Sequence, residues 1–308
     1  MLNGLKKNEK IDFEDQGFVI FKNFFKKNEL SLLLNAVKRI QNEMELNDNY
    51  DENNFQIRNL ISHDESFLDL IDNPKILSLV VDTLGWNIQI RTSHLDVRKP
   101  YPEELREHNL KIGKGKDLKA GYRNVFWHAD LSEQRNILGC SLDGILPFME
   151  IKLFIPLFDM NESNCGNLWF APGTHKRPIK ELIDNNREVP KSDSLELKLN
   201  SGDMVLWRTA LWHCVGPNYS NKTRKIIHIG YQHRWLRPTD YIEQSEELIS
   251  ESEPIRQQLL GALPKSNKPG LGSDSKYAPV SQYWFPENDE DVPLKNWAEN
   301  NLIKSNLI

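Results

Sequence analysis

Residues 149–159 read MEIKLFIPLFD, and side chains of two kinds alternate along this run. The odd-numbered positions from 151 to 157 are all Ile or Leu, whereas the even-numbered positions include Glu150 and Lys152. Because successive residues of a strand point to opposite faces, the run predicts a strand with one apolar face. A lysine in the middle of a strand is costly to bury alone. Lys152 therefore either pairs with Glu150 on an outer face or lines a polar pocket.

Short runs of the same β-forming character, bounded by turn residues, occur on both sides of this strand. They lie at residues 17–21, 87–97, 168–171, 203–209 and 224–233. Several short strands without long helices between them are typical of a sandwich or barrel and not of a parallel sheet. We therefore predict a mainly β protein with flanking helices.

Helices are predicted before and after these strands. Apolar residues recur at three- and four-residue steps over residues 30–44, with Asn28 as the expected cap. A second helix is expected to begin after Asn73, with Pro74 in its first turn, and to end at Gly85. Both helices are expected to brace the sheet. After Trp235 the chain becomes polar, and residues 241–260 predict a pair of helices.

The composition excludes several classes of protein. A chain of 308 residues with 39% hydrophobic content is consistent with one domain. The net charge of −5 gives no overall basic field for nucleic acid or anionic membranes. The chain has three cysteines, Cys140, Cys165 and Cys214, and none of them form a C-x-x-C pair. An odd number without this spacing suggests neither a disulfide framework nor a zinc site, and it predicts reduced thiols in a cytoplasmic protein. No apolar run approaches the ~18 residues of a membrane span, so we expect no membrane association. The expected partner is a small-molecule substrate, and the protein is expected to be a monomer or homodimer.

The residues with the clearest chemical meaning are His128, Asp130 and His213. In a strand, His128 and Asp130 would point to the same side and Ala129 away from it. His213 would have to approach from a distant segment of the sandwich. Two imidazoles and one carboxylate leave three positions of an octahedral ferrous ion free, although the same set suits other metals and chemistries. Each histidine taken alone is more often structural, and only their combination favours a metal site.

Arg224 adds a second feature, because a guanidinium is well suited to hold a carboxylate with two hydrogen bonds. Alternation along residues 224–233 places Arg224, Ile226 and His228 on one face. If that face lines the interior of the sandwich, Arg224 needs an anion; otherwise it is a surface residue at the start of a strand. His228 is expected to be a hydrogen-bonded core histidine and not a fourth metal ligand.

The ordered segments 127–130 (WHAD), 166–176 (GNLWFAPGTHK), 202–203 (GD) and 213–216 (HCVG), followed by Asn218, Ser220 and Arg224, resemble the phytanoyl-CoA dioxygenase family. That family consists mainly of oxygenases that depend on ferrous iron and 2-oxoglutarate and have a double-stranded β-helix (jelly-roll) fold. The resemblance covers residues 10–236. We therefore expect a single oxygenase domain over residues 1–308, with a jelly-roll core at 10–236 and a helical extension at 237–308.

Carried over position by position, the resemblance implies three iron ligands, namely His128, Asp130 and His213. It also implies that Arg224 binds the distal carboxylate of 2-oxoglutarate and that Lys99, which precedes a proline, lies close to this cosubstrate. The chain departs from the family at Ala129, where glutamine is frequent. It departs again at Val215, where a small hydroxyl residue can occur.

The implied function is that of a dioxygenase that uses Fe(2+), 2-oxoglutarate and O2 and releases succinate and CO2. It would hydroxylate, desaturate or cyclise a small polar or anionic metabolite at an unactivated C–H bond. Because related halogenating enzymes lack the ligating carboxylate, Asp130 favours oxygenation over halogenation. No catalytic residue beyond the metal centre is expected. The residues considered for substrate binding are three cations and one aromatic residue near the site: Arg123, Lys152, Arg208 and Trp127.

Two alternatives remain open at this level. The chain could be a non-catalytic jelly-roll protein that binds a ligand, or a cupin-type metal-dependent lyase or isomerase that does not use 2-oxoglutarate. Arg224 argues against the second of these. The charged segment 99–121, with Gly113 and Gly115, is either a lid over the site or a solvated surface loop.

Overall fold

The computed structural model describes residues 2–44, 55–103, 126–130, 143–262 and 292–302. Within these ranges the strands form two antiparallel sheets, a large one in the order β1-β7-β4-β9-β3-β2 and a small one in the order β6-β5-β8. The strands are β1 (Phe18–Phe21), β2 (Phe55–Arg58), β3 (Ile88–Arg98), β4 (Glu150–Pro156), β5 (Leu168–Phe170), β6 (Leu195–Glu196), β7 (Met204–Arg208), β8 (His213–Val215) and β9 (Arg224–His233).

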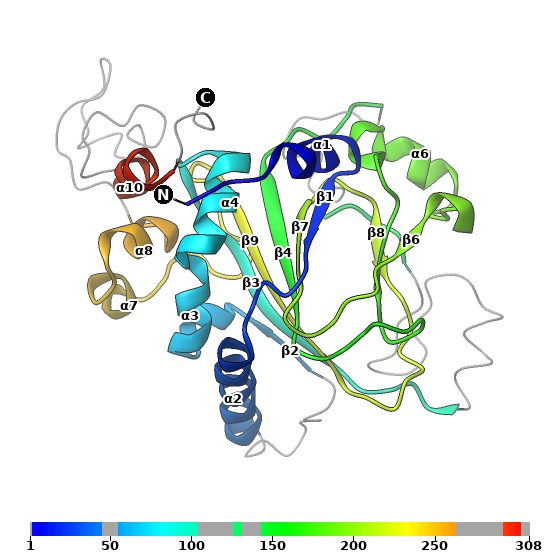
Figure 1. The fold of residues 1–308 in the computed structure, drawn as a ribbon, viewed down its shortest axis with the longest axis horizontal. Helices are drawn as coiled ribbons and strands as arrows, with labels where there is room; N and C mark the ends of the chain where they lie inside the picture. The colour runs from blue at the N-terminus through cyan, green and yellow to red at the C-terminus, as the bar shows by residue number, and fades with distance from the viewer. Residues whose placement is uncertain (1, 45–54, 104–125, 131–142, 263–291, 303–308) are drawn as a thin grey trace.

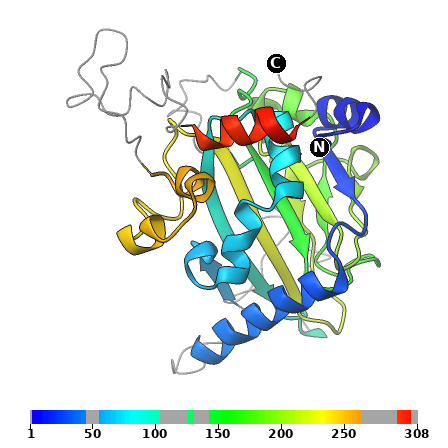
Figure 2. The ribbon, with the colours of Figure 1, turned by 60° about the vertical axis from the view of Figure 1, so that its left-hand side comes forward.

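Helices cover the face of the large sheet that is turned away from the small sheet (Figure 1). Figure 2 shows α2, α3, α4 and α10 lying across that face. The helices are α1 (Lys7–Asp15), α2 (Lys27–Met44), α3 (Glu65–Ile71), α4 (Pro74–Leu84), α6 (Ile179–Asp184), α7 (Glu246–Ser250), α8 (Pro254–Leu259) and α10 (Pro293–Asn301). The protein therefore has three layers: helices, large sheet and small sheet.

The alternation along β4 explains why both faces of the large sheet are buried. Ile151, Leu153 and Ile155 are fully buried in the cluster that contains the helix residues, whereas Phe154 belongs to the cluster between the two sheets. Burying one such side chain contributes about 1.5–3 kcal/mol. The prediction of an apolar face at residues 151–157 is confirmed, and the small sheet covers the opposite face.

Most of the predicted elements are present. The runs predicted as strands at 87–97, 149–159, 168–171, 203–209 and 224–233 correspond to β3, β4, β5, β7 and β9. The Asn73 side chain caps α4 by accepting a hydrogen bond of 3.0 Å from the Lys75 amide, and Gly85 ends the helix with a φ of 84°. The cap predicted at Asn28 is wrong, because α2 already begins at Lys27. Glu29 instead accepts a hydrogen bond from the Lys26 amide.

The C-terminal helices are part of the same core. Leu259 of α8 and Leu294 and Ala298 of α10 are buried in the cluster between the helices and the large sheet. The predicted helix pair at 241–260 corresponds to α7 and α8. No helix in the described ranges is both long enough and apolar enough to cross a bilayer. Most of the segment 99–121, as well as Arg123 and Cys140, lies outside the described residues.

Candidate metal centre

Backbone pairing brings His128 and His213 together. The His128 amide donates to the His213 carbonyl at 2.9 Å, and the His213 amide donates to the His128 carbonyl at 2.8 Å. The Asp130 amide donates to the Thr209 carbonyl at 3.0 Å. The segment 128–130 is therefore fixed beside the start of β8 in the small sheet, although the two histidines are far apart in sequence.

The side chains of these three residues converge on one carboxylate oxygen. The Nε2 atoms of His128 and His213 lie 3.8 and 3.6 Å from Oδ1 of Asp130. Both distances exceed the range of an N–H···O hydrogen bond. An ion with bonds of about 2.1 Å can bridge atoms up to about 4.2 Å apart, so both gaps suit a metal ion.

The hydrogen bonds of the two imidazoles fix which nitrogen is free. His128 Nδ1 donates to the Phe126 carbonyl at 2.9 Å, and His213 Nδ1 donates to the Leu211 carbonyl at 2.8 Å. Since a carbonyl can only accept, Nδ1 carries the proton in both rings and the Nε2 lone pairs face Asp130. Ligating histidines have their second nitrogen held in this way.

The charge states also suit a metal. Burial, together with the neighbouring His213, lowers the pKa of His128 to about 4. Burial alone would raise the pKa of Asp130, but the Lys152 ammonium and His213 hold it well below its ordinary value. A neutral imidazole and an ionised carboxylate are the forms that bind metals. The three residues therefore fit a divalent transition-metal ion.

Lys152 lines this site and is paired with Asp130. Its Nζ lies 2.8 Å from Oδ2 of Asp130, the oxygen that does not face the histidines, and 5.8 Å from the centre of the Trp207 ring. Lys152 is therefore buried and does not pair with Glu150 on an outer face. Glu150 pairs with the buried Arg91 and not with Lys152. Burial and the nearby Asp130 raise the pKa of Glu150 to about 7, and Arg91 opposes this rise.

Arg224 is 2% exposed and points into the interior between the sheets. Its Nε donates to the Gly166 carbonyl at 2.9 Å, and a Cβ on Gly166 would lie 2.6 Å from Arg224 Cδ. The nearest acidic group is Asp96, 4.0 Å from Nη1, and Nη2 is buried without a partner among the described residues. Burial lowers the pKa of Arg224 to about 10. A buried guanidinium with an unsatisfied N–H group fits a ligand carboxylate.

Trp127 and Ala129, the neighbours of His128 in the chain, point away from the candidate metal site. Trp127 and Ala129 are 6% and 1% exposed and belong to the apolar cluster that also contains Leu182 and Trp212. Ala129 fills a tightly packed position there, which gives a physical reason for a small residue. The structure therefore does not bring the side chain of Trp127 to those of His128, Asp130 and His213.

Arg208 lies on the other face of the large sheet. It is directly opposite Ile151 in the pairing of β4 with β7, and Ile151 faces the helices. The Arg208 guanidinium pairs with Glu14 and lies 4.3 Å from the centre of the Phe148 ring. Because both contacts are on the helix side, the structure does not bring Arg208 to the metal centre.

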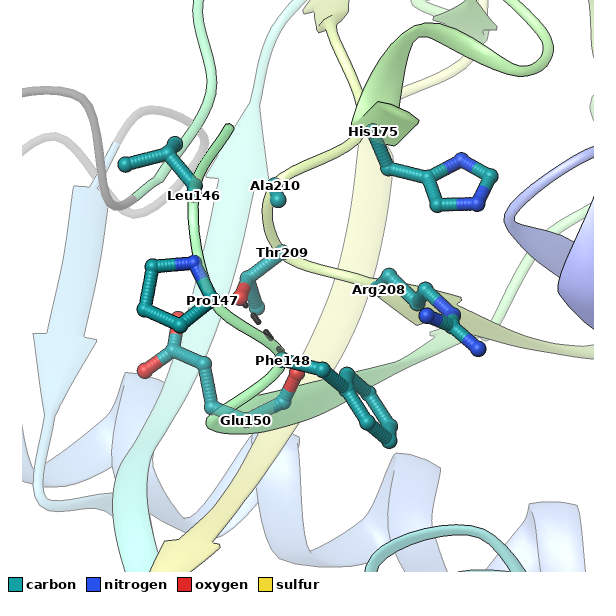
Figure 3. A pocket seen from close by; sticks show the side chains of 8 residues that line it. All are labelled: Leu146, Pro147, Phe148, Glu150, His175, Arg208, Thr209 and Ala210. Carbon is teal, nitrogen blue, oxygen red and sulfur yellow. Dashed lines mark hydrogen bonds between the residues drawn. The ribbon is translucent and has the colours of Figure 1, made fainter. Parts of the chain in front are cut away.

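Figure 3 shows a small pocket lined by Arg208, Glu150 and His175. Its volume is about 20 Å³, room for about one water molecule and not for a substrate. A larger cavity of about 570 Å³ beside α6 is lined in part by Arg177 and Trp212, and by none of His128, Asp130 and His213. Neither cavity therefore marks a substrate site at the metal centre.

Two further residues named from the sequence lie at strand ends. Lys99 is half-buried just beyond the end of β3, and Val215 is 39% exposed at the end of β8. Arg123 lies outside the described residues.

The structure also groups three residues that the sequence reasoning did not connect. They are His94, Asp96 and His228, whose candidate ligand atoms lie within 4.8 Å of one another. His94-Leu95-Asp96 repeats the His-x-Asp spacing of residues 128–130, and this repetition could have revealed the group. His228 is buried as expected, but its Nδ1 has no hydrogen-bond partner in the described part of the chain.

Known proteins that resemble this chain are dioxygenases. Residues 13–226 match the family model described as phytanoyl-CoA dioxygenase. The dioxygenase olcK of Penicillium canescens is 25% identical over 163 residues, which are 53% of this chain and 50% of that protein. The match thus spans about half the length of this curated relative.

Two solved structures share the fold. HygX from Streptomyces hygroscopicus, with nickel and 2-oxoglutarate bound, has a TM-score of 0.57 at 14% identity, over 80% of this chain and 94% of HygX. EctD from S. alaskensis, with 2-oxoglutarate and 5-hydroxyectoine, has a TM-score of 0.56 at 15% identity, over 76% of this chain and 78% of EctD. The predicted double-stranded β-helix is therefore confirmed.

Proposed function

Since this chain belongs to the phytanoyl-CoA dioxygenase family of non-haem iron and 2-oxoglutarate dependent oxygenases, we propose that it oxidises an unactivated C–H bond of a small metabolite, with His128, Asp130 and His213 as the iron ligands. One observation carries this assignment. Two imidazoles, each held by a backbone carbonyl through Nδ1, direct Nε2 at the same oxygen of Asp130.

Each residue of the site has a defined task in this proposal. Iron and 2-oxoglutarate together supply the oxidising power, and succinate and CO2 are the co-products. Arg224 binds the distal carboxylate of 2-oxoglutarate through its unpaired Nη2, and the Phe154 ring, 5.7 Å from the guanidinium carbon, forms an apolar wall beside it. Lys99 is proposed as a further cosubstrate contact. The fixed positions of these groups reduce the entropy that the reactants lose on binding.

The substrate is proposed to be small and polar. Lys152 and Arg208 are each neutralised by a carboxylate, so neither requires an anionic substrate. Oε1 of Glu150 is buried without a partner among the described residues, and it can accept a hydrogen bond from a bound metabolite. Whether the C–H bond is hydroxylated, desaturated or used to close a ring depends on what the substrate places next to the oxidised carbon.

The cellular setting is also a proposal. We propose a cytoplasmic enzyme, a monomer or homodimer, that acts on a small molecule and binds neither nucleic acid nor membranes. The support is the net charge of −5 and the buried, unpaired Cys165 and Cys214.

Anaerobic addition of Fe(II) and 2-oxoglutarate to the metal-free protein tests the function directly. We expect a weak visible charge-transfer band, followed by succinate formation when O2 and a substrate from a metabolite screen are added. A folded protein that binds Fe(II) but gives neither the band nor succinate would be a lyase, an isomerase or a non-catalytic binding protein. Labelled O2 and mass spectrometry would then identify the oxidised product.

Lys152 is proposed to position the ligating carboxylate and not to bind substrate. Its ammonium holds Oδ2 of Asp130 and leaves Oδ1 facing the histidines. Replacing Lys152 with Met should weaken Fe(II) binding about 10- to 100-fold, the usual effect of removing a group that orients a ligand. Fe(II) affinity, measured anaerobically by competition with a fluorescent chelator, is the readout.

Matched variants separate positioning from folding. Lys152→Arg keeps a cation beside Asp130 and should recover most of the Fe(II) affinity. Lys75→Met, on the exposed side of α4, should leave the affinity unchanged. If Lys152→Met binds Fe(II) as tightly as the wild type but raises the KM of the substrate, Lys152 is a substrate-binding residue instead.

A further inference from the structure

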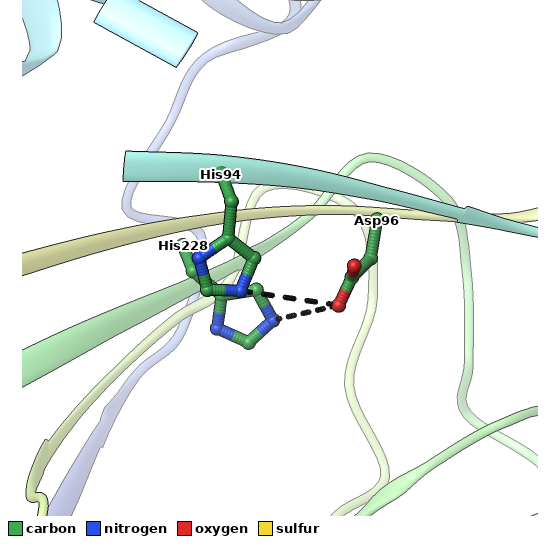
Figure 4. Close-up of side chains that lie close together, drawn as sticks. All are labelled: His94, Asp96 and His228. Atoms are coloured by element: carbon green, nitrogen blue, oxygen red, sulfur yellow. Dashed lines mark ion pairs between the residues drawn. The ribbon is translucent and has the colours of Figure 1, made fainter. Parts of the chain in front are cut away.

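His94 and Asp96 of β3 and His228 of β9 form a second group of two imidazoles and one carboxylate (Figure 4). His94 lies directly opposite His228 in the pairing of the two strands, and their rings stack with centres 4.4 Å apart. All three side chains point to the interior between the sheets, on the same face as Arg224. His94 and His228 are 5% and 6% exposed.

The distances in this group match those of the first group. Nε2 of His94 and Nε2 of His228 lie 3.9 and 3.7 Å from the same oxygen, Oδ2 of Asp96. The corresponding distances to Asp130 are 3.8 and 3.6 Å. They are again too long for hydrogen bonds and short enough for an ion with bonds of about 2.1 Å to bridge.

The charge states are those of metal ligands. Burial lowers the pKa of His94 to about 3 and holds the pKa of His228 well below its ordinary value. Burial would raise the pKa of Asp96, but the neighbouring His94 and His228 rings and the Arg224 guanidinium lower it overall. Two neutral imidazoles therefore face an ionised carboxylate that accepts no hydrogen bond from them.

Contacts around His94 resemble those that support metal ligands. Nδ1 of His94 lies 3.4 Å from Oγ1 of Thr92, whose own proton is donated to Asp240 at 2.7 Å. The Thr92 oxygen can therefore accept a hydrogen bond from Nδ1–H, and in that tautomer the Nε2 lone pair faces Asp96. The Arg58 guanidinium, also 3.4 Å from Nδ1, makes no hydrogen bond to Nδ1 in that tautomer and pairs with Asp240 at 3.6 Å.

Nearby positive charges determine which ions the group could hold. Arg98 and Arg224 lie 3.7 and 4.0 Å from the Asp96 carboxylate and compete for its charge. Ions that depend on carboxylate charge, such as Mg²⁺ and Ca²⁺, are disfavoured there. Ions of the late first transition series bond strongly to imidazole and are favoured.

We propose that His94, Asp96 and His228 form a second transition-metal site on the large sheet, distinct from the centre formed by His128, Asp130 and His213. Trp207 neighbours both sites, since its ring centre is 6.0 Å from that of His213 and 6.1 Å from that of His228. Each chain would then bind two ions, one held by the large sheet alone.

Titration of the metal-free protein with Co(II), followed by its visible absorption and by equilibrium dialysis, tests the proposal. The wild type should bind two ions per chain. His94→Gln and His228→Gln should each bind one, and so should Asp130→Ala, which removes a ligand of the first centre. His63→Gln changes an exposed histidine outside both groups and should still bind two. Circular dichroism and the melting temperature of each metal-free variant show whether it is folded.

The outcomes separate this inference from the proposed function. If the wild type binds one ion, which is kept by His94→Gln and His228→Gln and lost by Asp130→Ala, the second site does not exist and the proposed function stands. If the single ion is kept by Asp130→Ala and lost by His94→Gln, the second site exists and the first centre was wrongly assigned. Two ions in both His94→Gln and His228→Gln would also overturn the inference.

Discussion

Replacing Arg224 with Gln is expected to raise the KM for 2-oxoglutarate about 100-fold. Arg224 is almost completely buried, and its Nη2 has no partner among the described residues. A cosubstrate carboxylate that enters this interior would lose both its water and its counter-charge in the variant. Breaking a buried, hydrogen-bonded charge pair costs about 3 kcal/mol, which corresponds to the stated change in KM. Steady-state succinate formation at varied 2-oxoglutarate is the measurement.

Two further variants and one binding measurement serve as controls for Arg224→Gln. Arg224→Lys retains the charge but not the planar fork, so its KM should lie between those of the wild type and Arg224→Gln. Arg39→Gln, on the exposed side of α2, should behave as the wild type. Fe(II) affinity of the centre formed by His128, Asp130 and His213 should not change in Arg224→Gln, because the ion pair that Arg224 makes is with Asp96 and not with Asp130. An unchanged KM for 2-oxoglutarate would show that another cation holds the cosubstrate.

Replacing Asp130 with Ala is expected to weaken Fe(II) binding at the centre formed with His128 and His213 more than about 100-fold and to abolish succinate formation. Even groups that only orient metal ligands contribute about 10- to 100-fold to affinity, and Asp130 is proposed as a ligand itself. The charge-transfer band with 2-oxoglutarate should be lost as well. Anaerobic Fe(II) titration and absorption spectroscopy measure both effects.

This variant needs a stability control because it leaves Lys152 buried without its partner. An unpaired buried charge costs about 3–5 kcal/mol of stability. The double variant Asp130→Ala/Lys152→Met removes both charges and should recover much of the melting temperature without recovering Fe(II) binding. If the double variant binds Fe(II) normally, Asp130 is not a ligand.

Local patterns predicted much of the fold. Alternation in β4 and β9 predicted which residues face each side of the large sheet, because a strand reverses side-chain direction at every residue. Asn73, Pro74 and Gly85 predicted the limits of α4 through caps that act within one helical turn. The same local reasoning failed at Asn28, because α2 begins at Lys27 and Glu29 accepts a hydrogen bond from the amide of Lys26, the residue before the helix.

From the sequence by itself, strand periodicity predicted a sandwich or barrel, because periodicity is a property of short segments. The ordered motifs, through their resemblance to a known family, implied the double-stranded β-helix and the ligand set that we propose. Only the tertiary structure decided that Lys152 pairs with Asp130, that Arg208 lies on the helix side, and that two His-x-Asp segments each meet a distal histidine. These contacts join residues from strands that are distant in sequence. Which side chains meet depends on strand register and sheet order, and no local pattern encodes either.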